Sequence, residues 1–223
     1  GIVSMLGAVL FFSLMDAALK ELAGSYSPMQ VAFLRGVSGL PLVLIPAVVQ
    51  RDWRILIPRR WLLHVARGFL SVLTLSTFVY AVGVLSLADA YSIFLAAPLI
   101  ATALSVPILG EPVGWRRWIA IGVGLLGALI ILRPSGAGLA TMGGLAALIS
   151  ACCYGLGVVL IRVATRTDTA TATVVWTLLT MTLISGVLAA RDWTPLASEH
   201  WRWVFWIGIT GAIGQLLLTE AFR

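Results

Sequence analysis

The sequence has few charged residues. Of its 223 residues, 11% are charged and 60% are hydrophobic, and the mean hydropathy is +1.03. A soluble globular domain carries about 25% charged residues, because its surface must face water. A soluble domain is therefore excluded, and lipid is the expected solvent of most of the surface.

The sequence also has few residues that bind metals or form disulfides. Its two cysteines, Cys152 and Cys153, are adjacent and lie inside an apolar stretch. Adjacent cysteines rarely bridge each other, so no disulfide framework is expected. The two histidines, His64 and His200, are far apart in the chain, so we predict neither a metal site nor a cofactor.

The basic residues are not arranged for nucleic-acid binding. The net charge is +6, but Lys and Arg form short clusters between apolar stretches rather than one basic face. Such clusters set the orientation of membrane proteins, so a nucleic-acid partner is not expected.

Long apolar stretches fill most of the chain. A helix needs about 20 apolar residues to cross the bilayer core, because every backbone group must be bonded internally. Gly, Pro and Ser clusters separate the stretches. The eight predicted spans are residues 2–19, 28–49, 61–83, 87–109, 115–132, 139–161, 170–190 and 201–220. The sequence therefore predicts an all-α, polytopic transmembrane helix bundle.

The Lys and Arg residues outside the spans are distributed unequally between the two sides of this bundle. Nine fall on the side that holds the N-terminus, and four fall on the other side. Cytoplasmic loops carry an excess of Lys and Arg. We predict a multi-pass protein of the cytoplasmic (inner) membrane, with its N-terminus in the cytoplasm.

Small residues recur at every fourth position in two predicted helices. Close backbone approach matters in lipid, where hydrophobic association between helices is weak. The two series are Gly143, Ala147, Ala151 and Gly155 in the sixth predicted helix, and Ala120, Gly124 and Ala128 in the fifth. Both series are predicted to form tight helix contacts.

Pro98 lies in the middle of the fourth predicted helix. Proline frees the carbonyl of the residue four positions earlier, here Phe94, and predicts a kink. The kink is interpreted either as a hinge beside a cavity or as a static bend.

Three motifs resemble those of one family. Gly110-Glu111-Pro112 followed by Gly114-Trp115-Arg116-Arg117-Trp118 resembles the end of the repeat unit in EamA-type transporters of the drug/metabolite transporter superfamily. The opening helices and the fourth helix resemble the same unit through Phe12-Ser13-Leu14-Met15-Asp16-Ala17 with Phe33-Leu34-Arg35, and through Leu87-Ala88-Asp89-Ala90 with Ala96-Ala97-Pro98. Within the family, the opening is most similar to S-adenosylmethionine-uptake proteins and general metabolite carriers.

The resemblance implies a ten-helix protein built as a 5+5 inverted repeat. Residues 1–134 would form the first repeat (helices 1–5), and residues 135–223 an incomplete second repeat (helices 6–8), in a chain truncated at both ends. It also implies a secondary transporter that moves an amino acid, a nucleoside or an S-adenosylmethionine-like metabolite by alternating access. The expected partners are this small molecule and the lipid bilayer, and a homodimer is left open.

Polar side chains within the spans are the candidates for substrate contact. A charge at the bilayer centre costs about 2.5–3.5 kcal/mol, so it usually faces a cavity or a partner. The candidate substrate-binding residues are Asp16, Lys20, Arg35, Tyr80, Asp89, Tyr91, Tyr154 and Glu220, with Pro98 as a hinge.

Four of these candidates also have structural interpretations as partners or caps. Asp16 and Lys20 are spaced to form a local ion pair on one helix. Arg35 is too deep to be a simple interface anchor, and Asp16 is its candidate partner. Asp89 suits the first turn of the fourth helix as a cap.

Side chains near the predicted span ends have a different interpretation. Tyr91 and Tyr154 fit the aromatic belt of a membrane protein. Arg67 is expected to extend to the lipid headgroups. Tyr80 fits a cavity wall, and Glu220 lies near the cytoplasmic boundary of the last predicted span.

Two other classes of function are alternatives at this stage: a membrane-embedded enzyme and a helical scaffold subunit. An enzyme would need an activated nucleophile or a metal cluster, and the sequence has no G-x-S-x-G or H-E-x-x-H motif. A scaffold would not explain Asp16, Arg35 and Asp89 together. The sequence therefore favours a transporter over an enzyme.

Overall fold

The computed structural model describes residues 2–110, 113–132 and 141–221, and these described residues form helices and no strands. In chain order the elements are α1 (Ile2–Ala23), α2 (Pro28–Gln50), η1 (Trp53–Leu56), α3 (Trp61–Val84), α4 (Leu87–Phe94), α5 (Ala97–Leu109), α6 (Trp115–Leu132), α7 (Met142–Ala164), α8 (Ala170–Ala189), η2 (Ser198–His200) and α9 (Trp201–Ala221). Glu111 and Pro112 of the Gly-Glu-Pro motif lie outside the described residues.

The helices confirm a polytopic membrane bundle. Seven segments within the described residues are long and apolar enough to cross a membrane, namely α1, α2, α3, the α4–α5 pair, α7, α8 and α9. The remaining predicted span forms α6, some of whose side chains lie outside those described. The sixth predicted span was expected to begin at residue 139, which is also outside the described residues, and α7 begins at Met142.

The predicted fourth span is broken into two helices at its centre. α4 ends at Phe94 and α5 begins at Ala97, so Pro98 lies in the first turn of α5. In a first turn the missing N–H of proline needs no helical partner, whereas in a continuous helix it removes a hydrogen bond and the ring clashes. The prediction of a kink had the right position, but the chain makes a full break there.

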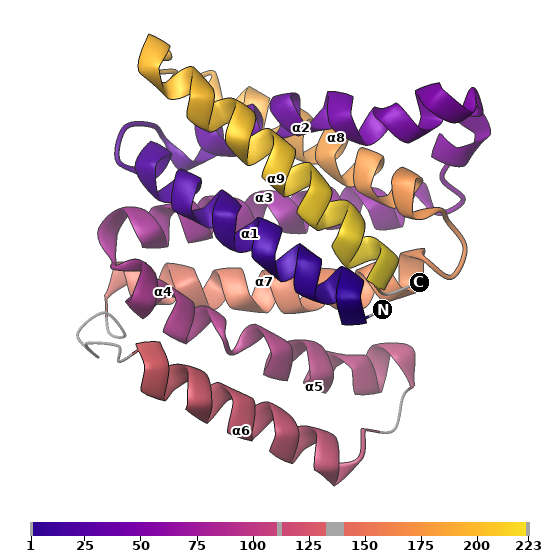
Figure 1. Ribbon diagram of the computed structural model, residues 1–223, viewed down its shortest axis with the longest axis vertical. Coiled ribbons are helices and arrows are strands. Elements are labelled where there is room, and N and C mark those ends of the chain that lie inside the picture. The colour runs from indigo at the N-terminus through magenta and orange to yellow at the C-terminus, as the bar shows by residue number, and fades with distance from the viewer. Residues whose placement is uncertain (1, 111–112, 133–140, 222–223) are drawn as a thin grey trace.

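Three helix pairs make the most extensive contacts in the bundle. α1 packs against α9, α3 against α7, and α2 against α8, while α2 also contacts α9 and α3 also contacts α8. Figure 1 shows α6 at one edge, beside α5, and shows both chain ends on the same side of the bundle.

The series of small residues in α7 is buried, as predicted. A Cβ atom added to Gly155 would lie 3.1 Å from the backbone nitrogen of Ala101 and 3.2 Å from the backbone oxygen of Ala97. The backbones of α7 and α5 therefore approach too closely for a larger residue at this position.

The tight contact predicted along α6 is wrong. Ala120 and Gly124 are exposed, and a Cβ atom on Gly124 would meet nothing within 4 Å. The side chain of Ala128 lies outside those described. The spacing of small residues shows that one face of α6 could pack closely against another helix. It does not show whether a helix covers that face.

His64, in the first turn of α3, meets Asp168 of the loop that connects α7 to α8 (residues 165–169). Nε2 of His64 lies 2.7 Å from Oδ2 of Asp168, and both side chains are buried. The backbone N–H of Arg59 donates to Oδ1 of Asp168 at 3.0 Å. Burial raises the pKa of Asp168, but the hydrogen bonds from His64 and from the backbone outweigh it and hold that pKa below its usual value.

We expect the substitution Asp168→Ala to lower the free energy of unfolding by about 1–3 kcal/mol, because it leaves buried donors without an acceptor. The measurement is thermal unfolding of the purified protein in detergent, with the exposed Asp192→Ala as a control that should unfold like the wild type.

The difference between wild type and Asp168→Ala should also depend on pH. A lowered folded-state pKa stabilises the protein above the unfolded-state pKa, near the ordinary value of 3.8, and this stabilisation is lost as the pH falls through the folded-state pKa. The difference should therefore be full at neutral pH and shrink in acid. A difference that grows in acid would contradict this assignment.

Candidate functional site

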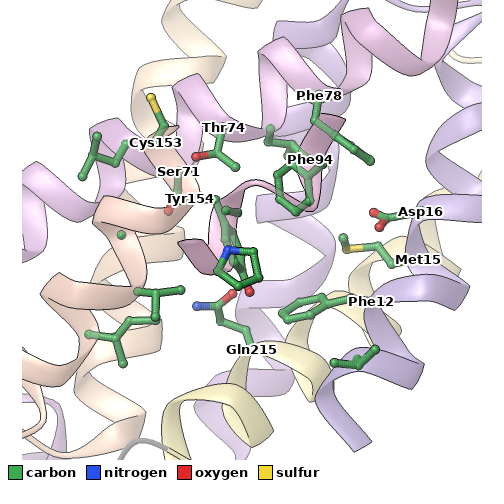
Figure 2. Close-up of a pocket in the computed structure, with 18 of the residues that line it drawn as sticks. Phe12, Met15, Asp16, Ser71, Thr74, Phe78, Phe94, Cys153, Tyr154 and Gln215 are labelled. Atoms are coloured by element: carbon green, nitrogen blue, oxygen red, sulfur yellow. The ribbon is translucent and has the colours of Figure 1, made fainter. Parts of the chain in front are cut away.

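Side chains from α1, α2, α3, α4, α5, α7 and α9 line a partly open cavity of about 330 Å³. Figure 2 shows side chains from several of these helices around it. Its polar lining residues are Ser13, Asp16, Arg35, Arg67, Ser71, Thr74, Tyr91, Tyr154 and Gln215.

Aromatic rings form one wall of the cavity. The Phe94 ring lies 5.3 Å from that of Phe78 and 5.2 Å from that of Tyr154, measured between ring centroids. Tyr91 meets Phe78 edge-on at 5.7 Å, and Phe12 of α1 also lines the cavity (Figure 2). Such a wall can stack against a planar group or attract a cation.

The break between α4 and α5 places two of these rings. Tyr91 and Phe94 lie in the last turn of α4, and the chain restarts as α5 with Pro98, which also lines the cavity. Pro98 was predicted as a hinge; the structure shows a break at the cavity wall, and a hinge movement stays a prediction.

Asp16 is a buried carboxylate on the wall of the cavity. Its Oδ2 atom accepts a hydrogen bond from the Tyr91 hydroxyl. Arg35, the predicted partner of Asp16, lines the same cavity and interacts with the carboxylate electrostatically. Among the described residues, no nitrogen of the Arg35 guanidinium lies within 4.0 Å of a carboxylate oxygen of Asp16, so the two side chains do not form an ion pair.

The predicted ion pair between Asp16 and Lys20 is wrong. Nζ of Lys20 donates to the backbone oxygens of Val82 and Leu85, the latter at 2.8 Å. These oxygens lie at the end of α3, where a helix has carbonyl groups without intrahelical partners. Lys20 therefore caps α3, and it is absent from the described cavity lining.

Two buried arginines line the cavity. Arg35 is 9% exposed and Arg67 is 3% exposed. Nη1 of Arg67 donates to the backbone oxygen of Thr173 in α8 at 3.1 Å. The Nε atoms of both arginines are buried and have no partner among the described residues. The prediction that Arg67 extends to the headgroups is wrong, because its side chain turns inward against α8.

Tyr91 and Tyr154 also face the interior of the bundle. Both line the cavity, and Tyr154 stacks against Phe94. Their interpretation as belt residues at the lipid interface does not hold, since their rings pack against Phe78 of α3 and Phe94 of α4.

Three other candidates lie outside this cavity, within the described part of the chain. Tyr80 is 45% exposed on α3 and borders a shallow surface pocket. Asp89 lies in the first turn of α4, as predicted, but the N-cap is Ser86: its Oγ accepts from the Asp89 backbone N–H at 3.0 Å and donates to Asp89 Oδ2 at 2.7 Å. Glu220 is exposed near the end of α9.

A polar stripe on α3 was not identified from the sequence. Arg67, Ser71, Thr74 and Phe78 all line the cavity, at intervals of four, three and four residues. This spacing puts the side chains on one helix face. The signal was present in the sequence, because three polar residues at helical spacing interrupt an otherwise apolar span.

The described residues show no arrangement for binding a metal ion. Among them, no group of three or more His, Cys, Asp or Glu side chains comes close enough to hold one. What the cavity offers a ligand is one carboxylate, two guanidinium groups, hydroxyl groups and aromatic faces.

Comparisons with known proteins find relatives among membrane transporters. The pseudopaline exporter CntI of Pseudomonas aeruginosa is 26% identical over 213 residues, covering 95% of this chain and 74% of the exporter. The S-adenosylmethionine uptake transporter of Rickettsia prowazekii is 31% identical over 134 residues, covering 60% of this chain and 45% of that transporter. The riboflavin transporter of Rhizobium johnstonii is 25% identical and covers 98% of this chain and 70% of that transporter.

The fold and the family are shared with known proteins. One solved crystal structure matches with a TM-score of 0.75 and 18% identity, covering 99% of this chain and 79% of that one. Residues 1–133, more than half of the chain, match the family described as the EamA-like transporter family. The chain, a multi-pass membrane protein, belongs to the EamA-like transporter family.

Proposed function

We propose that the protein is a secondary transporter that moves a small organic metabolite across the cytoplasmic membrane by alternating access. The observation that carries the proposal is the cavity at membrane depth, where Asp16, Arg35 and Arg67 lie beside an aromatic wall. Ionisable groups within membrane helices are costly and mark substrate or ion pathways.

The substrate class follows from the lining and is supported by the relatives. The cavity combines both signs of charge with aromatic faces, which suits an amino acid, a nucleoside or an S-adenosylmethionine-like solute. The relatives are named for pseudopaline export, S-adenosylmethionine uptake and riboflavin transport, which are all movements of organic metabolites.

The helix packing supports two inverted repeats, with residues 1–134 in the first and residues 135–223 in the second. In this assignment α1 corresponds to α7, α2 to α8 and α3 to α9. If each helix is replaced by its counterpart in the other repeat, the α1–α9 contact becomes the α7–α3 contact, and the α2–α9 contact becomes the α8–α3 contact. The α2–α8 contact is its own counterpart. All of these contacts are present, as two equivalent repeats require. The family match to residues 1–133 agrees with the proposed boundary. Inverted repeats support rocking of one half against the other around a central site.

Hydrogen bonds join the two proposed repeats at both ends of the bundle. His64 meets Asp168 at one end, and at the other the Tyr26 hydroxyl lies 2.7 Å from Nδ1 of His200. Each contact joins the loop after the first helix of one repeat to the start of the third helix of the other. In an alternating-access cycle, the hydrogen bond at one end of the bundle would break while the hydrogen bond at the other end stays formed.

Transport is tested by flux into proteoliposomes that contain the protein expressed from its complete gene. The solutes are S-adenosylmethionine, riboflavin, amino acids and nucleosides, each labelled. Saturable flux of one solute supports the proposal. If no solute moves while the reconstituted protein is folded, the protein is not a transporter of this substrate class.

We expect Asp16→Asn to reduce flux about tenfold or more, because a hydrogen bond to a charged group contributes about 1.5–3 kcal/mol. Glu21→Gln is the matched control, since Glu21 is an exposed acid on the same helix, and its flux should equal that of the wild type. Equal flux in Asp16→Asn and the wild type would remove Asp16 from the substrate pathway.

The proposed orientation places the N-terminus in the cytoplasm. We expect a cysteine in place of the exposed Ile57 to react with an impermeant maleimide only in inside-out vesicles, and one in place of the exposed Ser25 only in intact cells. Both substitutions are made with Cys152 and Cys153 replaced by serine. The reverse labelling pattern would invert the topology.

A further inference from the structure

Arg67 is a buried cation whose hydrogen bonding is incomplete. The guanidinium group has five N–H donors, and the Arg67 side chain is 3% exposed. Nη1 is bound to the backbone oxygen of Thr173, while Nε is buried and has no partner among the described residues. A buried donor without an acceptor is unfavourable, and because Arg67 lines the cavity, a ligand atom that accepts this hydrogen bond would remove the cost.

Arg67 also lacks a carboxylate partner within the described part of the chain. The buried carboxylate of Asp168 pairs with His64, and the electrostatic partner of Asp16 is Arg35. The charges of Asp16 and Arg35 offset each other across the cavity. Arg67 therefore leaves the described cavity lining with one uncompensated positive charge.

Arg67 lies at a different depth from this Asp16–Arg35 pair. Arg67 lies about 9 Å along α3 from Trp61, which is at one end of the bundle. Asp16 lies about 10 Å along α1 from Ala23, which is at the opposite end. Ser71 and Thr74 follow Arg67 on the same face and add hydroxyl groups, and Phe78 then begins the aromatic wall.

We propose that Arg67 binds the carboxylate of the transported metabolite and that the protein selects solutes bearing this group. The inference rests on the proposed function and adds to it a substrate class and a specificity-determining residue. Arg67 lines the cavity, and its one hydrogen bond through Nη1 leaves the Nε edge without a protein partner among the described residues. That edge matches the two oxygens of a carboxylate. Phe78 lies about 16 Å farther along α3, so the far end of an extended solute would reach the aromatic wall.

The test compares ligands that differ only in the carboxylate. The probes are S-adenosylmethionine with its decarboxylated analogue, and phenylalanine with phenylalaninamide. Binding is measured by the thermal stabilisation of the full protein in detergent, and flux of the same compounds is measured in proteoliposomes. The variants are Arg67→Gln and Arg67→Lys, and the control is Arg166→Gln, because Arg166 is exposed in a loop.

The wild type should bind at least one carboxylate about tenfold more tightly than its partner compound, as expected for a charged hydrogen-bonded pair. Arg67→Gln should lose the preference for the carboxylate but still bind the partner compound weakly. Arg67→Lys should retain part of the preference. Arg166→Gln should show the same preference as the wild type. The inference is overturned if the wild type shows no preference, or if Arg67→Gln retains the full preference.

A lipid phosphate is the competing oxyanion for the Arg67 guanidinium group, so phosphatidylglycerol is added as a further probe. If it stabilises the wild type but not Arg67→Gln and displaces the carboxylate probe, the inference is overturned. Should Arg67→Gln fail to fold, the preference of the wild type and its partial retention in Arg67→Lys still decide the question. Flux without carboxylate preference overturns only this inference, whereas the absence of all flux and binding overturns the proposed function as well.

Discussion

The absence of water at membrane depth is the constraint on which the structure depends, because each polar group there must find a partner within the protein. Hydroxyl groups find one locally: those of Ser76, Thr177 and Ser185 donate to the carbonyl four residues earlier in their own helices. Lys20 reaches another helix and caps α3. The Nε atoms of Arg35 and Arg67 are exceptions to this rule, and both side chains line the cavity.

The cavity depends on local features of the chain as well as on these charges. Pro98 disfavours a continuous helix, and the chain breaks beside the site and leaves Tyr91 and Phe94 in the last turn of α4. Gly155 then lets α7 approach α5 at backbone distance, which brings Tyr154 of α7 against Phe94. One proline and one glycine thus position the aromatic wall that faces Asp16.

Much of the fold could be predicted from the sequence, because the length of an apolar stretch is set by bilayer thickness. The direction in which a side chain points was harder to predict, since lipid and protein interior are both apolar and give a membrane helix little amphipathic contrast. Asp16, Arg35, Tyr91 and Tyr154 were found by type and depth, and they meet in one cavity. Lys20 has the same features, but its long side chain caps α3 instead, which depends on how α1 and α3 pack.

The opposite error occurred at Arg67. Because Arg67 lies near the end of a predicted span, its side chain was expected to reach the lipid headgroups. Instead it donates a hydrogen bond to the backbone carbonyl of Thr173 in α8, which holds it inside the bundle. Ser71 and Thr74 on the same face were a signal for this inward orientation, because polar residues at helical spacing rarely face lipid.

The central claim is that the transported solute occupies this cavity, and cysteine protection tests it most directly. Cys153 lines the cavity whereas Cys152 is exposed, so a Cys152→Ser protein reports on the cavity alone. Alkylation of Cys153 by a small maleimide is followed with and without the solute that the protein moves. The account predicts that this solute slows the labelling, whereas unchanged labelling at saturating solute would contradict it.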